Sequence, residues 1–211
     1  MTMKFKWHAF KIAGICILAF ILQIFIGSFT ELFLLDANSW YQPWRFLTAI
    51  FLHGGFGHLL YNMFALVLFG SILERLIGGK RFLLVFFTSG VLANIIAVNF
   101  YPSSLGASGA IFGVIGALVI VRPMLIVWAF GLPMPIFVAG ILWAGGDLIG
   151  AVGYLSGNPI NNTGNLAHLS GMFFGLLLGA FYRNWKQRRV KKEKAYLDEG
   201  SVRNWEDDWM R

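Results

Sequence analysis

Long apolar stretches without charged residues alternate with short polar segments along this chain. The first stretch runs from Ile12 to Thr30 and the second from Phe46 to Leu73. A helix needs about 20 apolar residues to cross the hydrocarbon layer of a bilayer. Each stretch therefore predicts one membrane span, and the second leaves room for a short embedded or interfacial piece around His53 before its span begins.

Two further stretches are each long enough for a pair of spans. The stretch from Phe82 to Val121 is broken by turn-forming residues between Asn99 and Ser104. The stretch from Pro123 to Tyr182 contains a polar turn from residue 153 to residue 164. The pattern thus predicts six spans in all.

Six spans over residues 1–182, followed by a tail over residues 183–211, predict an all-α membrane protein with one transmembrane helix bundle. Hydrophobic residues make up 57% of the chain and charged residues 13%, unlike the composition of an ordinary soluble domain. The first stretch is longer than the apolar core of a signal peptide, and no small-x-small cleavage site follows it near Glu31. We therefore expect it to be retained as the first span.

The basic residues predict the orientation of these spans. With an even number of spans, all 17 Lys and Arg residues except Arg45 fall on the side that holds both termini. Because basic residues favour the cytoplasmic side, we expect cytoplasmic termini in a multi-pass protein of the cell membrane. The basic run from Arg183 to Lys194 predicts attraction to anionic lipid headgroups. The basic residues are divided among short segments that border the spans, so they do not favour nucleic-acid binding.

Four polar residues fall where a bilayer disfavours them. His58 and Asn62 share one helix face at the outer end of the second span, Ser108 starts the fourth span and His168 starts the sixth. With the predicted orientation, all four lie at one depth. Polar side chains that persist in spans are candidates for function.

Two stripes of small residues predict that the fourth and sixth spans pack closely. The stripes are Gly109, Gly113 and Gly116 in the fourth span, and Gly171, Gly175 and Gly179 in the sixth. Small residues let membrane helices approach each other closely. Such an approach would bring the Ser108 hydroxyl within hydrogen-bond reach of His168, as an activated serine requires.

Four short motifs also stand in order on these predicted elements. They are Trp44-Arg45, His58-Leu-Leu-Tyr-Asn62, Gly106-Ala-Ser108-Gly109 and Ala167-His168-Leu-Ser-Gly171-Met-Phe-Phe-Gly175. Through them, the segment from Trp44 to Gly179 resembles the rhomboid family of intramembrane proteases. The span count is similar to that of the simplest, prokaryotic form of the family.

This resemblance implies a role for each motif. Ser108 is implied as the nucleophile and His168 as its general base, with the oxyanion bound by His58, Asn62 and the Ser108 backbone N–H. Phe112 takes the place of a Tyr that often stacks under the catalytic His in the family, so stacking is expected without its hydroxyl. The remaining positions are implied to be structural: Trp44 and Arg45 in the first outer loop, and Gly106, Gly109, Gly171 and Gly175. No metal or cofactor is implied.

Three other polar residues have structural interpretations. His53 is expected to form a structural hydrogen bond, and Glu74 to tie the inner end of the second span to a neighbour. Asp147 is the one acidic residue of the last long stretch and a possible third member of a catalytic triad. The resemblance implies a Ser–His dyad instead, which leaves Asp147 paired or facing water near the outer end of the fifth span.

Together these features predict an intramembrane serine endopeptidase that cleaves transmembrane substrates near the outer leaflet. Single-span or other transmembrane proteins are the expected partners, and the resemblance implies lateral entry between the second and fifth spans. Phe137 and Trp143, chosen for their size, are the candidate gate residues of the fifth span.

An alternative is a catalytically silent rhomboid-like protein that binds membrane clients, although such relatives typically lack the Ser or the His. A transporter or channel is disfavoured because the polar residues form no track across the membrane.

Overall fold

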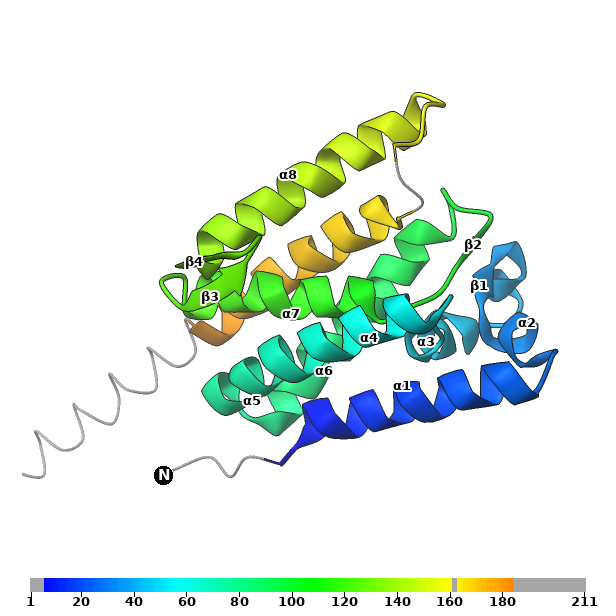
Figure 1. Cartoon of the computed structure of the whole chain (residues 1–211), viewed down its shortest axis with the longest axis horizontal. Helices are drawn as coiled ribbons and strands as arrows, with labels where there is room; N and C mark the ends of the chain where they lie inside the picture. Colours follow the sequence, from blue (N-terminus) through cyan, green and yellow to red (C-terminus); the bar gives the residue numbers. More distant parts are fainter. Residues whose placement is uncertain (1–5, 161–162, 184–211) are drawn as a thin grey trace, which may run out of the picture.

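The computed structural model of this chain describes residues 6–160 and 163–183 (Figure 1). Five of its helices are long and apolar enough to cross a membrane. They are α1 (His8–Phe25), a helix over Phe56–Ile77, α6 (Gly79–Ala97), α8 (Ile136–Leu155) and a final helix over Asn165–Arg183. The Phe56–Ile77 helix joins α4 (Phe56–Ala65) to α5 (Ser71–Ile77) through a π-helical stretch, Leu66–Gly70. The chain is therefore a multi-pass, all-α membrane protein.

The sixth helix of the bundle, α7 (Ser108–Val121), is shorter than the others. Its 14 residues extend about 21 Å at 1.5 Å per residue, less than the ~30 Å of a hydrocarbon layer. It runs through the middle of the bundle (Figure 1) and most of its side chains are buried. At least one end of α7 must therefore lie below the membrane surface.

Short elements link the helices at one end of the bundle. Between α1 and α4 lie α2 (Phe29–Phe33), β1 (Leu35–Asp36), a 3-10 turn (Ala37–Trp40), α3 (Arg45–Thr48) and a second 3-10 turn (Ala49–Phe51). β1 pairs antiparallel with β2 (Ser103–Ser104), which precedes α7. This pairing joins the loop between α1 and α4 to the segment that leads into Ser108.

A β-hairpin that the sequence analysis did not predict joins α7 to α8. It consists of β3 (Ile126–Ala129) and β4 (Leu132–Pro135) in antiparallel register. Phe130 and Gly131 form its turn, both with positive φ, at 54° and 78°. Two successive positive φ values are typical of the tight turns that suit the twist of a hairpin.

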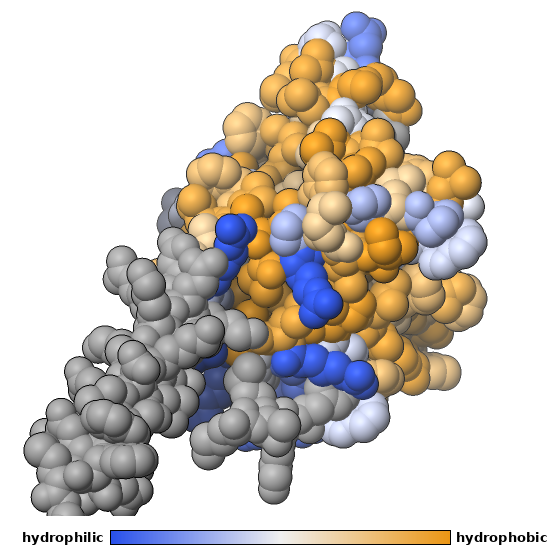
Figure 2. Space-filling view, turned by 90° about the vertical axis from the view of Figure 1, so that its left-hand side faces the viewer, coloured by the Kyte–Doolittle hydropathy of each residue, from blue (hydrophilic) through white to orange (hydrophobic). Residues whose placement is uncertain are grey.

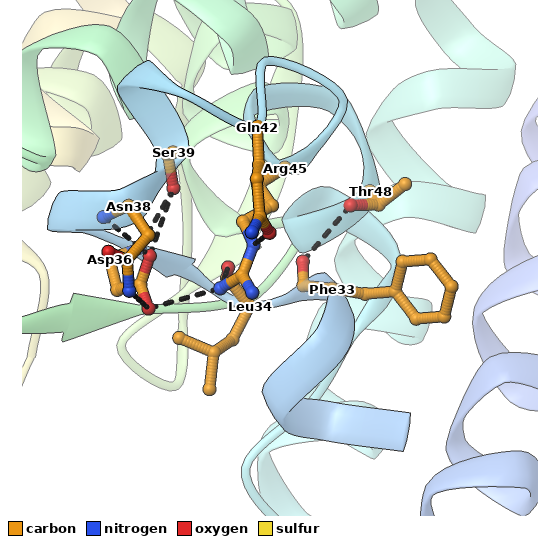
Figure 3. A network of polar contacts seen from close by, with 8 residues as sticks. All are labelled: Phe33, Leu34, Asp36, Asn38, Ser39, Gln42, Arg45 and Thr48. Atoms are coloured by element: carbon orange, nitrogen blue, oxygen red, sulfur yellow. Dashed lines mark hydrogen bonds and ion pairs between the residues drawn. The ribbon is translucent and has the colours of Figure 1, made fainter. Parts of the chain in front are cut away.

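Arg45 holds together the loop between α1 and α4 (Figure 3). Its guanidinium forms an ion pair of 3.0 Å with Asp36 and donates to Gln42 Oε1 at 2.6 Å and to the Leu34 carbonyl at 3.2 Å. Thr48 Oγ1 also donates to the Phe33 carbonyl. Because Arg45 is buried, these bonds satisfy a charge that would otherwise be costly to desolvate.

The described chain begins and ends at the same end of the bundle (Figure 1). Hydrophilic residues lie among hydrophobic ones on that end of the molecule (Figure 2). Helices begin or end at this end of the bundle with five described basic residues: Arg75, Lys80, Arg81, Arg122 and Arg183. Arg45 lies at the opposite end. This arrangement agrees with the charge distribution predicted for an even number of spans.

Glu74 joins the N-terminus of α1 to the end of α5. Its carboxylate accepts hydrogen bonds from the backbone N–H groups of Lys6, His8 and Ala9, at 2.9 to 3.3 Å. The first N–H groups of a helix have no partner within the helix. A carboxylate from a neighbouring helix supplies one here, which confirms the predicted tie between this helix end and a neighbour.

Candidate active site

One cavity of about 740 Å³ is lined by all four polar residues that the sequence singled out. His58 and Asn62 reach it from α4, Ser108 from the start of α7 and His168 from the final helix. The cavity therefore lies where three helices that are distant in sequence meet.

The backbone before Ser108 requires glycine. Gly106 has a φ of +131°, a conformation that residues with a side chain rarely adopt. A Cβ on Gly106 would also lie 2.8 Å from His58 Cε1, too close for ordinary contact. The Gly106 N–H donates to the Ala49 carbonyl at 2.9 Å, which anchors the loop that presents Ser108.

Glycines bring α7 and the final helix together as the two stripes predicted. A Cβ on Gly171 would collide with the Gly109 carbonyl, and one on Gly175 with the Gly113 carbonyl. A Cβ on Gly109 would lie 3.4 Å from the Ala167 carbonyl oxygen. Since Ser108 precedes Gly109 and His168 follows Ala167, this contact places the turns that carry the two residues against each other.

The buried His168 ring is held on one face and at one edge. The Phe112 ring lies against it, with 4.3 Å between ring centroids and an angle of 8° between the planes. His168 Nδ1 lies 3.1 and 3.2 Å from the two carboxylate oxygens of Asp147. Because a carboxylate accepts hydrogen bonds, Nδ1 is the donor and Nε2 is left as an acceptor.

The position of Asp147 differs from the arrangement that the family resemblance implied. From the sequence, Asp147 was a possible third triad member, but a dyad was favoured, with Asp147 paired or facing water. The structure pairs it with His168 itself. These residues are 21 positions apart on different helices, so no local spacing in the sequence indicated the contact.

His58 and Asn62 lie on successive turns of α4. The Gly54 N–H donates to His58 Nδ1 at 3.4 Å, which leaves the proton of a neutral ring on Nε2. A Cβ on Gly106 would lie 3.1 Å from this Nε2 and 3.9 Å from Ser108 Oγ, so the two groups are close neighbours. Asn62 is buried and donates from Nδ2 to the His58 carbonyl at 2.8 Å, and its amide carries a second N–H.

His53 packs beside these residues and forms the expected structural hydrogen bonds. Its backbone N–H and carbonyl both bond to the Gln23 side chain of α1, and its Nδ1 lies 3.2 Å from the Phe51 carbonyl. Its ring meets that of His58 edge-on, at 5.2 Å. His53 thus connects α1 to the cavity wall.

Two tyrosines that no motif indicated, Tyr101 and Tyr154, also line the cavity. Tyr101 Oη accepts from the Leu166 N–H at 3.1 Å, Tyr154 Oη donates to the Phe100 carbonyl at 2.6 Å, and the two rings lie 4.8 Å apart. Burial raises the pKa of Tyr101, so its hydroxyl stays protonated near neutral pH. The pair joins the end of α8 to the loop before α7 and to the start of the final helix.

Within residues 6–160 and 163–183, no group of three or more His, Cys, Asp and Glu side chains is arranged to hold a metal ion. Hydroxyls, amides and the imidazoles of His58 and His168 line the cavity, and the Asp147 carboxylate contacts His168. A serine hydroxyl and a histidine ring that line the same cavity are the groups that nucleophilic catalysis uses.

Comparisons with known proteins agree with this interpretation. A family-wide sequence profile described as "Rhomboid domain" matches residues 41–185. YdcA of Bacillus subtilis (strain 168), assigned by its name to the rhomboid proteases, is 37% identical over 69% of this chain and 70% of its own length. Rhomboid protease GluP of the same bacterium is 48% identical over 37% of this chain, but this covers 16% of GluP. RHOMBOID-like protein 7 of Arabidopsis thaliana is 35% identical over 76% of this chain and half of its own length. The chain belongs to the rhomboid family of intramembrane serine proteases.

Proposed function

We propose that this protein is an intramembrane serine endopeptidase that hydrolyses peptide bonds of transmembrane proteins near the outer leaflet. One observation carries the proposal: Ser108, His168, His58 and Asn62 line the same cavity. Ser108 is the nucleophile and His168 is its general base and acid.

In the first half of the reaction, the substrate helix unwinds locally and presents a peptide carbonyl to Ser108. Ser108 Oγ attacks the carbonyl carbon while His168 Nε2 takes the hydroxyl proton. The tetrahedral intermediate collapses, the C–N bond breaks, and His168 returns the proton to the leaving amine. The substrate acyl group is left as an ester on Ser108.

The developing oxyanion is stabilised by donors from two helices. The Ser108 N–H stands in the first turn of α7, where backbone N–H groups have no acceptor within the helix and the helix dipole favours negative charge. His58 Nε2 and the second N–H of Asn62 supply the side-chain donors. Donors fixed in place before the reaction act more strongly in a site with little water.

In the second half, water hydrolyses the acyl-enzyme with His168 as the base. The cavity wall includes hydroxyl groups that can bind water along this route, from Tyr101, Ser103, Ser104 and Thr163. Polar residues at the outer end of the cavity support water access from that side. No cofactor takes part in the proposed reaction.

Substrates enter from the lipid between α8 and the Phe56–Ile77 helix in this proposal. Trp143 of α8 lines the cavity and meets the Phe69 ring edge-on at 5.9 Å. The aromatic contact therefore spans the proposed entrance. The basic end of the bundle faces the cytoplasm, with both termini on that side of the cell membrane.

The alternative function is a catalytically silent rhomboid-like protein that binds membrane clients. Labelling with a serine-directed fluorophosphonate separates the two functions without any need to know a substrate. We expect covalent labelling of the wild type, none of Ser108→Ala and very little of His168→Ala. Equal labelling of wild type and Ser108→Ala, or no labelling of either, would favour the binding protein.

A further inference from the structure

We infer that Asp147 orients His168 and fixes its tautomer, so that the proposed Ser108–His168 pair works as a Ser–His–Asp triad. This inference rests on the proposed function and adds a positioning residue from α8. Asp147 and His168 are both buried, and both carboxylate oxygens lie within 3.2 Å of His168 Nδ1.

The position of Asp147 within a span indicates a specific role. Acidic side chains within membrane helices are costly and persist where they have a partner or a function. In the described part of the chain, the helices of spanning length hold two acidic residues, Glu74 and Asp147. Glu74 binds the backbone N–H groups that begin α1, whereas Asp147 faces the ring of the proposed base.

The backbone of α8 is shaped for this contact. Gly150 lies one turn after Asp147, and a Cβ there would lie 2.7 Å from Asn165 Cγ, at the start of the final helix. The absence of a side chain at Gly150 lets α8 approach the final helix close to His168. Gly150 therefore allows the close approach of the two helices, and Asp147, one turn earlier, makes the contact with His168.

The chemistry follows from which ring nitrogen carries the proton. The carboxylate accepts a hydrogen bond from Nδ1–H, so Nε2 keeps the lone pair that receives the Ser108 proton. When the ring becomes an imidazolium during attack, the carboxylate stabilises its positive charge, and no proton passes to Asp147. Phe112 restrains the ring on its face and Asp147 at its edge, so the two contacts together fix its orientation.

The first test is the activity of Asp147→Asn in the purified full chain. In soluble triads, an Asp-to-Asn change lowers kcat about 10⁴-fold because it favours the wrong tautomer. We expect a loss in kcat of at least about 10-fold with little change in KM, since the residue acts through His168 rather than on the substrate. Asp147→Glu keeps a carboxylate and should recover part of this loss. Leu148→Ala, an exposed neighbour on the same helix, is the matched control and should keep the wild-type kcat.

The second test reads the tautomer directly, because Asp147 can orient the base as proposed only if it holds the proton on Nδ1. The chain has four histidines, so ¹⁵N-histidine labelling gives few signals, and His168→Ala assigns the one of interest. We expect Nδ1 to be protonated in the wild type and Nε2 to gain the proton in Asp147→Asn. A wild-type His168 that is protonated on Nε2 would overturn the inference, even if Asp147→Asn does not fold.

The outcomes separate this inference from the proposed function. If Asp147→Asn keeps wild-type kcat while Ser108→Ala abolishes cleavage, the triad is wrong and the serine protease stands. If folded Ser108→Ala still cleaves, the proposed function itself is wrong, whatever Asp147→Asn does.

Discussion

Individual contacts explain why particular residue types occur in the cavity. His58 accepts from the Gly54 N–H on one ring nitrogen, and its other ring nitrogen lies close to Gly106, two residues before the proposed nucleophile. Asn62 uses one of its two N–H groups on its own helix. Each of these side chains therefore has a donor held in place, which is what an oxyanion site requires.

Asn62→Ala removes one of three proposed oxyanion donors. We expect kcat to fall on the order of 10² to 10³ or less, with residual cleavage still detectable, because the Ser108 N–H and His58 remain. Initial rates of the purified variant measure the loss. A fall to the background of Ser108→Ala would show that Asn62 has a different role.

At the scale of helices, the position of each span follows from the sequence more readily than its contacts do. The long apolar stretches between Ile12 and Tyr182 predicted the bundle, and the glycine stripes predicted the helix pair at its centre. The hairpin Ile126–Pro135 could not be predicted, because a continuous apolar run looks like the start of a span. The contact of Asp147 with His168 could not be predicted from the sequence either, because it depends on how closely α8 approaches the final helix.

Gly175→Val tests the close packing of α7 against the final helix. A side chain at Gly175 would collide with the Gly113 carbonyl, so the helices must separate. We expect a loss of about 1–3 kcal/mol in stability, with a lower Tm in thermal unfolding. Gly145→Ala is the control, because a Cβ there meets nothing within 4 Å. An unchanged Tm for Gly175→Val would contradict the packing.

Trp143→Ala tests the proposed entrance between α8 and the Phe56–Ile77 helix. The change removes the aromatic contact with Phe69, so we expect faster cleavage of transmembrane substrates in detergent or vesicles. Phe137, the other gate candidate chosen for its size, does not line the cavity, so Phe137→Ala serves as the matched control on the same helix and should keep the wild-type rate. Identical rates for the wild type, Trp143→Ala and Phe137→Ala would place the entrance elsewhere.

At the scale of the molecule, the polar groups are divided between two ends of an apolar bundle. The described basic residues apart from Lys11 and Arg45 gather at one end, and the cavity residues lie towards the other. This division was predictable from span count and charge, because both are properties of the whole chain. The basic run after Arg183 lies outside the described residues, and its attraction to anionic lipid headgroups stays a prediction.

Cysteine labelling tests the orientation in the cell membrane. The native Cys16 is buried and should give little background. We expect an impermeant thiol reagent added from outside to label Asn158→Cys after α8 and to miss Met124→Cys, which is exposed just before β3, at the other end of α8. The reverse pattern would invert the proposed topology.

Cleavage by the wild type and by Ser108→Ala, with products mapped by mass, tests the central claim most directly. Both purified proteins are incubated with the same panel of single-span substrates. The wild type should cut a bond near the outer end of a substrate span. Ser108→Ala should fold with a similar Tm, because it loses a single hydroxyl, and should give no product above background. If folded Ser108→Ala cuts at the same bond, Ser108 is not the nucleophile and the assignment of this site is wrong.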